Sequence, residues 1–258
     1  MALIFDSHSH YDNPQFDEDR DEILSSLRSK GVGLILLAGC TLERSYAISE
    51  LTKKYDFAFG SAGVHPIDCI DEEIPYLDKL EALFKENKKL VAVGEIGLDY
   101  HYDNSPPELQ KRFLIEQLEL AKSLNKPVIL HFREATADML DILKEYKPKG
   151  VVHCFSGSVE TAKQVLDLGL YIGFTGVVTF KNAAKAKKSA QYVPLDRLLI
   201  ETDCPYMAPV PFRGQRCDSS MLTSVAEVLA EIKGVSKDDI LTHTYNNAVK
   251  VYEMEGLI

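Results

Sequence analysis

Short apolar runs rich in Val, Ile and Leu recur about eight times along the chain, with room for a helix between each pair. Strands of a parallel sheet that is covered on both faces are continuously apolar, whereas half-exposed strands alternate between apolar and polar residues. The runs do not alternate, so we predict eight buried parallel strands. They span residues 3–6, 34–38, 57–63, 91–95, 128–131, 151–153, 171–174 and 198–201.

The segments between these runs place apolar residues at helical spacing, which predicts amphipathic helices. The predicted helices span residues 19–29, 45–54, 76–87, 107–124, 136–145, 159–168, 183–192 and 219–232. Gly31, Gly150 and Gly169 stand where a helix should stop before the next strand. Ser236, with Asp239 three positions later, resembles a capping box and predicts a last helix that runs to about residue 254.

Eight strand–helix units in 258 residues predict a (β/α)₈ TIM barrel, with the last helix as a C-terminal addition. A doubly wound open sheet is the alternative, but the first strand is not followed by the Gly-x-Gly-x-x-Gly phosphate loop of that fold. We find no internal repeat, linker or low-complexity tract. We therefore expect residues 1–258 to form a single domain.

Composition fits a water-soluble globular protein, with 45% hydrophobic and 26% charged residues. No apolar run approaches the roughly 20 residues that span a bilayer, and the start of the chain does not resemble a signal peptide. The five cysteines are scattered and odd in number, which favours a reduced, cytoplasmic protein, and the lack of a long apolar run argues against a membrane partner. Nothing in the chain points to an obligate protein partner.

Polar residues with metal-binding side chains follow the predicted strands at their carboxyl ends. They are His8, His10, His65, Glu95, His131, His153 and Asp203. In a barrel these positions meet at one face, the face that carries the chemistry of such enzymes. Burying several imidazoles and carboxylates together is costly unless a cation pairs with them.

Six of these residues suffice for two divalent ions: His8 and His10 with Asp203 for the first, His131 and His153 for the second, and Glu95 as the bridge. Asp203 is also placed to take a proton from an attacking water. Imidazole ligands favour Mn²⁺ or Zn²⁺ over Mg²⁺, which prefers oxygen, although any of the three could serve in turnover.

His65 has no obvious place in either ligand set. It could contact a substrate phosphate, protonate a leaving oxygen, or simply cap a turn before Pro66. Asp6 is expected to support His10 or the metal, or to make a hydrogen bond at the end of its strand. Asp99 and His101 are expected in a loop after the fourth strand, where His101 is a weak candidate for the site.

Several short motifs together resemble one family, the TatD family of metal-dependent deoxyribonucleases in the amidohydrolase superfamily. They are Asp6-Ser7-His8-Ser9-His10, Gly63-Val64-His65-Pro66, Gly94-Glu95-Ile96-Gly97-Leu98-Asp99-Tyr100, His131, His153-Cys154-Phe155-Ser156-Gly157 and Glu201-Thr202-Asp203-Cys204-Pro205-Tyr206. The resemblance implies a metal-dependent hydrolase that trims single-stranded DNA from its 3′ end, with the same six ligands. The segment Arg216-Cys217-Asp218-Ser219 departs from the Arg-Asn-x-Pro-like segment of many relatives, which bears on substrate preference.

The net charge of −10 argues mildly against a nucleic-acid partner, so the basic residues near the site matter. Arg133, Arg213, Arg216 and the segment 181–188 could form a positive rim for phosphates. Phe132, Phe155, Phe180 and Tyr206 are available to stack on bases.

Two other functions remain open. A binuclear centre in a barrel can also hydrolyse a small ester, lactone, amide or aminoacyl bond. A non-catalytic binding or scaffold protein is the third reading, but such a protein would have no need of six convergent ligands.

Overall fold

The computed structural model describes residues 2–72 and 75–258 and shows eight parallel strands in one sheet, ordered as they occur in the chain. The predicted (β/α)₈ barrel is thereby confirmed. The strands are β1 (Ile4–Ser9), β2 (Val32–Leu37), β3 (Ala58–Ala62), β4 (Leu90–Asp99), β5 (Val128–Arg133), β6 (Gly150–Val152), β7 (Tyr171–Phe174) and β8 (Leu198–Ile200).

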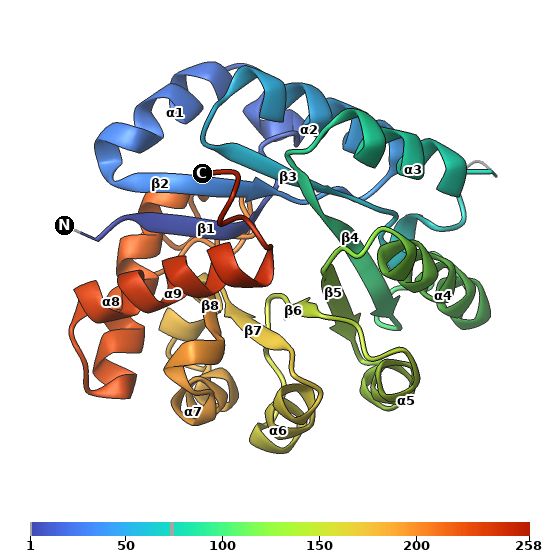
Figure 1. Cartoon of the computed structure of the whole chain (residues 1–258). Helices are drawn as coiled ribbons and strands as arrows, with labels where there is room; N and C mark the ends of the chain where they lie inside the picture. The colour runs from blue at the N-terminus through green and yellow to red at the C-terminus, as the bar shows by residue number, and fades with distance from the viewer. Residues whose placement is uncertain (1, 73–74) are drawn as a thin grey trace.

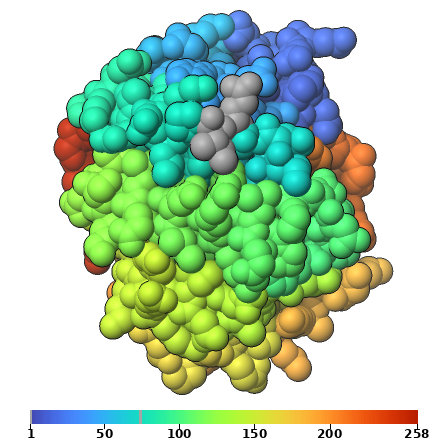
Figure 2. All heavy atoms as spheres, turned by 90° about the vertical axis from the view of Figure 1, so that its right-hand side faces the viewer, coloured from blue at the N-terminus to red at the C-terminus, as the bar shows by residue number. Residues whose placement is uncertain are grey.

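Helices follow each strand and cover the outside of the barrel (Figure 1). They are α1 (Arg20–Leu27), α2 (Leu42–Lys54), α3 (Leu77–Glu86), α4 (Pro107–Ser123), α5 (Thr136–Tyr146), α6 (Val159–Asp167), α7 (Ala184–Tyr192), α8 (Leu222–Lys233) and α9 (Lys237–Val251). In the space-filling view the colours run in chain order from blue through green to yellow, so successive units lie side by side (Figure 2). The predicted capping box at the start of α9 is present, with Ser236 and Asp239 bonded to each other's backbone N–H.

Strand β4 extends four residues beyond the end that the apolar pattern predicts. It continues past Glu95 to Asp99, and Gly97 and Asp99 pair with His131 and Arg133 of β5. The expectation that Asp99 lies in a loop is therefore wrong. The cause is the neighbouring strand, since β5 runs on to Arg133 and offers backbone groups for β4 to pair with.

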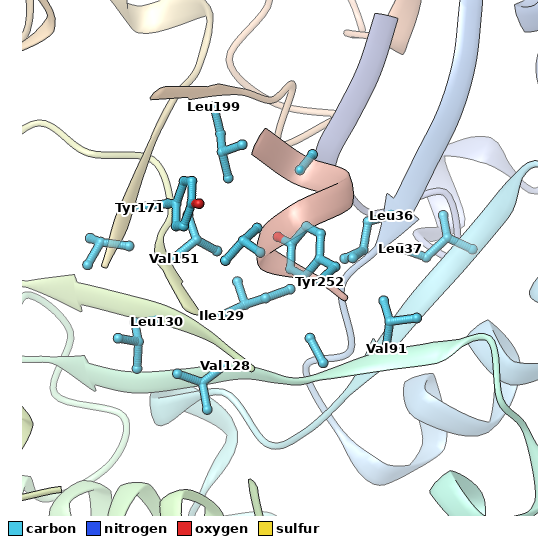
Figure 3. Close-up of a cluster of buried hydrophobic side chains, with 14 of the residues drawn as sticks. Leu36, Leu37, Val91, Val128, Ile129, Leu130, Val151, Tyr171, Leu199 and Tyr252 are labelled. Atoms are coloured by element: carbon cyan, nitrogen blue, oxygen red, sulfur yellow. The ribbon is translucent and has the colours of Figure 1, made fainter. Parts of the chain in front are cut away.

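The interior of the barrel is filled by apolar side chains from the strands, and Tyr252 at the end of α9 joins them (Figure 3). Tyr252 is 1% exposed, and its hydroxyl donates a hydrogen bond of 3.0 Å to the carbonyl of Ser7. Leu36, Val128 and Leu199 are among the strand residues around it. The predicted C-terminal helix is thus more than an outer layer, because its end supplies part of the core.

The first and last strands meet at a seam of a different kind. Among the described residues, β1 and β8 form no strand ladder, although every other neighbouring pair does. Beyond the end of β8, Asp203 N–H donates to the His8 carbonyl at 3.0 Å, and His10 N–H donates to the Cys204 carbonyl at 2.9 Å. These two bonds close the barrel at its carboxyl end.

Asp6, which lies in β1, reinforces this seam from inside. Its buried carboxylate accepts hydrogen bonds from the backbone N–H of Thr202 at 2.9 Å, the hydroxyl of Thr202 at 2.6 Å and the hydroxyl of Ser219 at 2.7 Å. Burial raises the pKa of Asp6 to about 6, against the lowering effect of those donors. Asp6 thus makes the hydrogen bonds that were expected of it, but from the middle of β1, because the strand continues to Ser9.

Candidate metal centre

A cavity of about 310 Å³ opens at the carboxyl end of the barrel and gathers the candidate ligands. Its wall is made of His10, Asn13, Cys40, Arg44, His65, Ile67, Asp68, Glu95, His131, His153, Asp203 and Tyr206. His8 lies at its base, fully buried. All seven residues expected from the strand ends are therefore brought to one place.

Glu95 stands at the centre of the cluster, and its two carboxylate oxygens face different histidines. Oε2 lies 3.3 Å from Nε2 of His8 and 3.8 Å from Nε2 of His10. Oε1 lies 2.7 Å from Nε2 of His153 and 3.1 Å from Nδ1 of His131. Oε1 also lies 3.3 Å from Nε2 of His65, so one oxygen faces two imidazoles and the other faces three, an arrangement that suits metal binding.

Asp203 completes the first of these groups. Its Oδ1 lies 3.2 Å from Nε2 of His10 and 3.7 Å from Nε2 of His8. The two ring nitrogens themselves are only 3.0 Å apart. These nitrogens and carboxylate oxygens lie close enough together to share one divalent cation.

Hydrogen bonds behind two of the rings decide which nitrogen is free. Nδ1 of His10 is 3.1 Å from the carbonyl of Ala38, and Nε2 of His131 is 2.9 Å from Asp99. A carbonyl or carboxylate only accepts, so these nitrogens carry the hydrogen. His10 Nε2 and His131 Nδ1, which face Glu95, are therefore the nitrogens that would bind a cation in place of a proton.

The charges of the cluster depend strongly on one another. Burial and the neighbouring His153 ring lower the pKa of His8 to about 4. Burial opposes the charge on His131 too, but the hydrogen bonds to Asp99 and Glu95 raise its pKa to about 9. Burial alone would raise the pKa of Glu95, yet the surrounding imidazoles hold it well below its usual range.

Glu201 lies behind His153 and is completely buried. It accepts hydrogen bonds from the backbone N–H of Cys154 and, at 3.3 Å, from the hydroxyl of Ser7. Its Oε1 is 3.8 Å from Nδ1 of His153, a buried nitrogen without a hydrogen-bond partner. Room for this carboxylate depends on Gly173, where a Cβ would stand 2.4 Å from Oε2.

His65 is both a capping residue and a member of the cluster. Its Nδ1 accepts a hydrogen bond of 3.3 Å from the N–H of Ile67 at the start of a short 3₁₀ helix (Pro66–Asp68). Its Nε2 lies 3.3 Å from Oε1 of Glu95. Because Nδ1 accepts, Nε2 of the neutral ring carries the hydrogen and points it into the cavity.

The basic residues expected at the rim lie outside this cavity. Arg133 packs over the ring of Tyr102, and Arg213 lies 4.3 Å over the ring of Phe180. Arg216 is tied to Asp19 and to the carbonyl of Gln15, which gives it a structural role. His101 pairs with Glu134 on the surface.

Three residues of the site were missed by the sequence patterns. Asp99 lies inside a strand and is hydrogen-bonded to His131. Glu201 lies beneath His153. Arg44 is on α2 and reaches the cavity wall. The Glu201-Thr202-Asp203 motif could have drawn attention to Glu201, but no periodicity marks Asp99 or Arg44.

Comparison with known proteins places this centre in a family. Residues 5–253 match the family described as TatD related DNase. The chain belongs to the TatD family. Relatives at full length include the uncharacterized metal-dependent hydrolase YabD of Bacillus subtilis, 40% identical over 98% of this chain and 100% of that protein. The 3′-5′ ssDNA/RNA exonuclease TatD of Cronobacter sakazakii is 34% identical over 96% of this chain and 97% of that protein.

Among solved structures, the TatD homologue YJJV of Escherichia coli superimposes with a TM-score of 0.92. It is 34% identical, and the match covers 97% of this chain and 98% of that one. This chain is accordingly a metal-dependent hydrolase of the TatD family. Within the described residues, no helix is both long and apolar enough to cross a membrane.

Proposed function

We propose that the protein is a deoxyribonuclease that removes nucleotides from the 3′ end of single-stranded DNA with two divalent metal ions. The observation that carries this proposal is the position of Glu95, whose two oxygens face different groups of imidazoles. The Cronobacter relative is named a 3′-5′ exonuclease on single-stranded DNA and RNA, which supports this choice of substrate.

The donor set fits two ions. His8, His10 and Asp203 would hold the first, His131 and His153 the second, and Glu95 would bridge them. Mn²⁺ and Zn²⁺ suit this mixture of imidazole and carboxylate better than Mg²⁺, although Mg²⁺ could also serve in turnover. Two such ions would lower the pKa of a water and neutralise charge on a phosphoryl group.

The protein's own residues then handle the proton and the substrate. The Asp203 carboxylate reaches the centre and can accept the proton that the attacking water loses. The Nε2–H of His65 points to the same place and can donate to a phosphate oxygen or to the leaving 3′ oxygen. Arg133 and Arg213 stay predictions for contacts with a longer strand, because neither lines the cavity.

The five cysteines described are all free thiols, which agrees with the expectation of a reducing compartment. We propose the cytoplasm as the location on this ground.

A nuclease assay with Mn²⁺ tests the function directly. The wild-type protein should shorten an oligonucleotide labelled at its 5′ end from the 3′ side, and Glu95→Ala should abolish the shortening. Asp141→Asn is the control, because Asp141 lies on the surface of α5, where it pairs with Lys144. No digestion by the wild type, or equal digestion by Glu95→Ala, rejects the proposal. Faster turnover of carboxyl esters or lactones than of DNA would instead favour the small-ester hydrolase.

A further inference from the structure

Arg44 is the one Lys or Arg among the described residues that line the metal cavity. It is the third residue of α2, the helix that follows β2, and Thr41 caps that helix. Its side chain is 36% exposed, so the guanidinium is neither buried in the core nor free in solvent. No other cation of this type faces the candidate metal ligands from the described part of the wall.

A buried carboxylate fixes the position of this guanidinium. Nη1 of Arg44 donates to Oδ2 of Asp12 at 2.8 Å, and the Asp12 side chain is only 1% exposed. The contact uses a single N–H, since Oδ1 of Asp12 has no hydrogen-bond partner. Nε and Nη2 of Arg44 have no hydrogen-bond acceptor among the described residues. The N–H groups on Nε and Nη2 are therefore held in place and are available to bind a ligand.

The surroundings of Arg44 suit a nucleotide more than a bare ion. Asn13 and Tyr206 line the same cavity, and Asn13 Nδ2 donates to the Tyr206 hydroxyl at 3.2 Å. Tyr206 is 49% exposed, so its ring is accessible to a flat ligand. Asp68 also faces this part of the cavity, and its negative charge interacts with both Arg44 and His65.

We propose that Arg44 binds a second anionic group of the substrate, the phosphate next to the scissile one in a DNA strand. This inference rests on the proposed function. The scissile phosphate would lie at the metal centre that these ligands form, and an arginine fork held by a carboxylate matches the oxygens of a neighbouring phosphate. Arg44 would thereby make the enzyme prefer a polyanionic strand over an isolated phosphodiester.

Two dinucleotides distinguish binding of the scissile phosphate from binding of the neighbouring one. TpT has one phosphodiester, and pTpT adds a 5′ phosphate next to it. For the wild type with Mn²⁺, kcat/KM should be about 10- to 100-fold higher for pTpT, the range expected of a charge-assisted hydrogen bond. Arg44→Gln should bring this ratio close to one, and Arg44→Lys should retain part of it. An unchanged ratio in Arg44→Gln overturns the proposal.

Arg28→Gln is the matched control. Arg28 also pairs with a single aspartate oxygen, Oδ1 of Asp56 at 3.0 Å, but it precedes β2, at the amino end of the barrel. This variant should keep the wild-type ratio, so a fall there would overturn the assignment to Arg44. Melting temperatures of all variants check that they are folded.

If the protein is not a deoxyribonuclease, the dinucleotides give a result different from an unchanged ratio in Arg44→Gln. In that case the wild type cleaves neither dinucleotide, and calorimetry on the Mn²⁺-loaded protein tests Arg44 by binding alone. Tighter binding of pTpT than of TpT that Arg44→Gln removes supports the subsite. Equal binding of the two compounds by the wild type overturns it.

Discussion

Asp99 shows how one side chain can select the free nitrogen of a neighbouring histidine. Its carboxylate fixes the hydrogen on Nε2 of His131 and leaves Nδ1 toward Glu95. We predict that Asp99→Asn weakens metal binding by about 10- to 100-fold, as is usual for such supporting residues. Calorimetric titration with Mn²⁺ or Zn²⁺ measures this, and Asp141→Asn, on the surface of α5, should bind metal like the wild type.

The protonation of His131 predicts how metal affinity depends on pH. Its pKa is raised from 6.5 to about 9 in the folded protein. In the metal-free protein its charge therefore stabilises the fold below pH 6.5, and this contribution is lost as the pH rises to about 9. Metal must replace the proton on Nδ1, so affinity should rise over the same window, by up to about tenfold per pH unit for each proton released.

Calorimetry in buffers of different ionisation enthalpy measures the protons released on metal binding. Binding that releases no proton near neutral pH, and an affinity independent of pH, would contradict the assignment of His131.

Residue patterns predicted which side chains converge at the site, but not the residues that support them from behind. His8, His10 and Asp203 could be found because they follow apolar runs, and in a barrel strand ends converge. Arg44 could not be found in this way, because a lysine or arginine near the start of a helix is ordinary on a protein surface. Its role depends on Asp12, which is distant in sequence and close only in the fold.

At the scale of elements, β7 leaves room for a carboxylate that belongs to the segment after β8. A Cβ at Gly173 would lie 2.4 Å from Glu201, whose carboxylate is buried and hydrogen-bonded and cannot move aside cheaply. We predict that Gly173→Ala destabilises the fold by about 1–3 kcal/mol and weakens metal binding through His153. Urea denaturation and metal titration measure the two effects.

Gly256→Ala is the comparison, because nothing lies within 4 Å of a Cβ at that position. It should match the wild type in both measurements. A stable Gly173→Ala protein with full metal affinity would show that Glu201 has space to move.

The elements were predictable wherever hydrophobic periodicity determines them. Strands β5 and β7 begin at the residues where their apolar runs begin, Val128 and Tyr171. Strand β4 was cut short because Gly94-Glu95-Ile96-Gly97 is neither apolar throughout nor alternating. Its extension comes from pairing with β5, a tertiary effect that local sequence does not report.

For the whole molecule, the segment that follows α9 contributes to the stability of the barrel. Tyr252 reaches the interior and bonds to the Ser7 carbonyl. We predict that Tyr252→Phe costs about 1 kcal/mol for the lost hydrogen bond, and Tyr252→Ala about 3–5 kcal/mol for the cavity. Urea denaturation measures both, and the exposed Tyr192 provides a Tyr192→Ala control within about 0.5 kcal/mol of the wild type. Equal stability of Tyr252→Ala and the wild type would exclude a core role.

The seam between β1 and β8 has a consequence for motion. His8 and His10 lie on one side of it and Asp203 on the other, and the two strands share no ladder in the described residues. A cation bound by all three would connect the ends of β1 and β8, the one neighbouring pair of described strands without ladder hydrogen bonds. Removal of the cation should let β1 and β8 separate locally while the other strands stay paired. The backbone amides of His10 and Asp203 would then be the first of the barrel to exchange with deuterium.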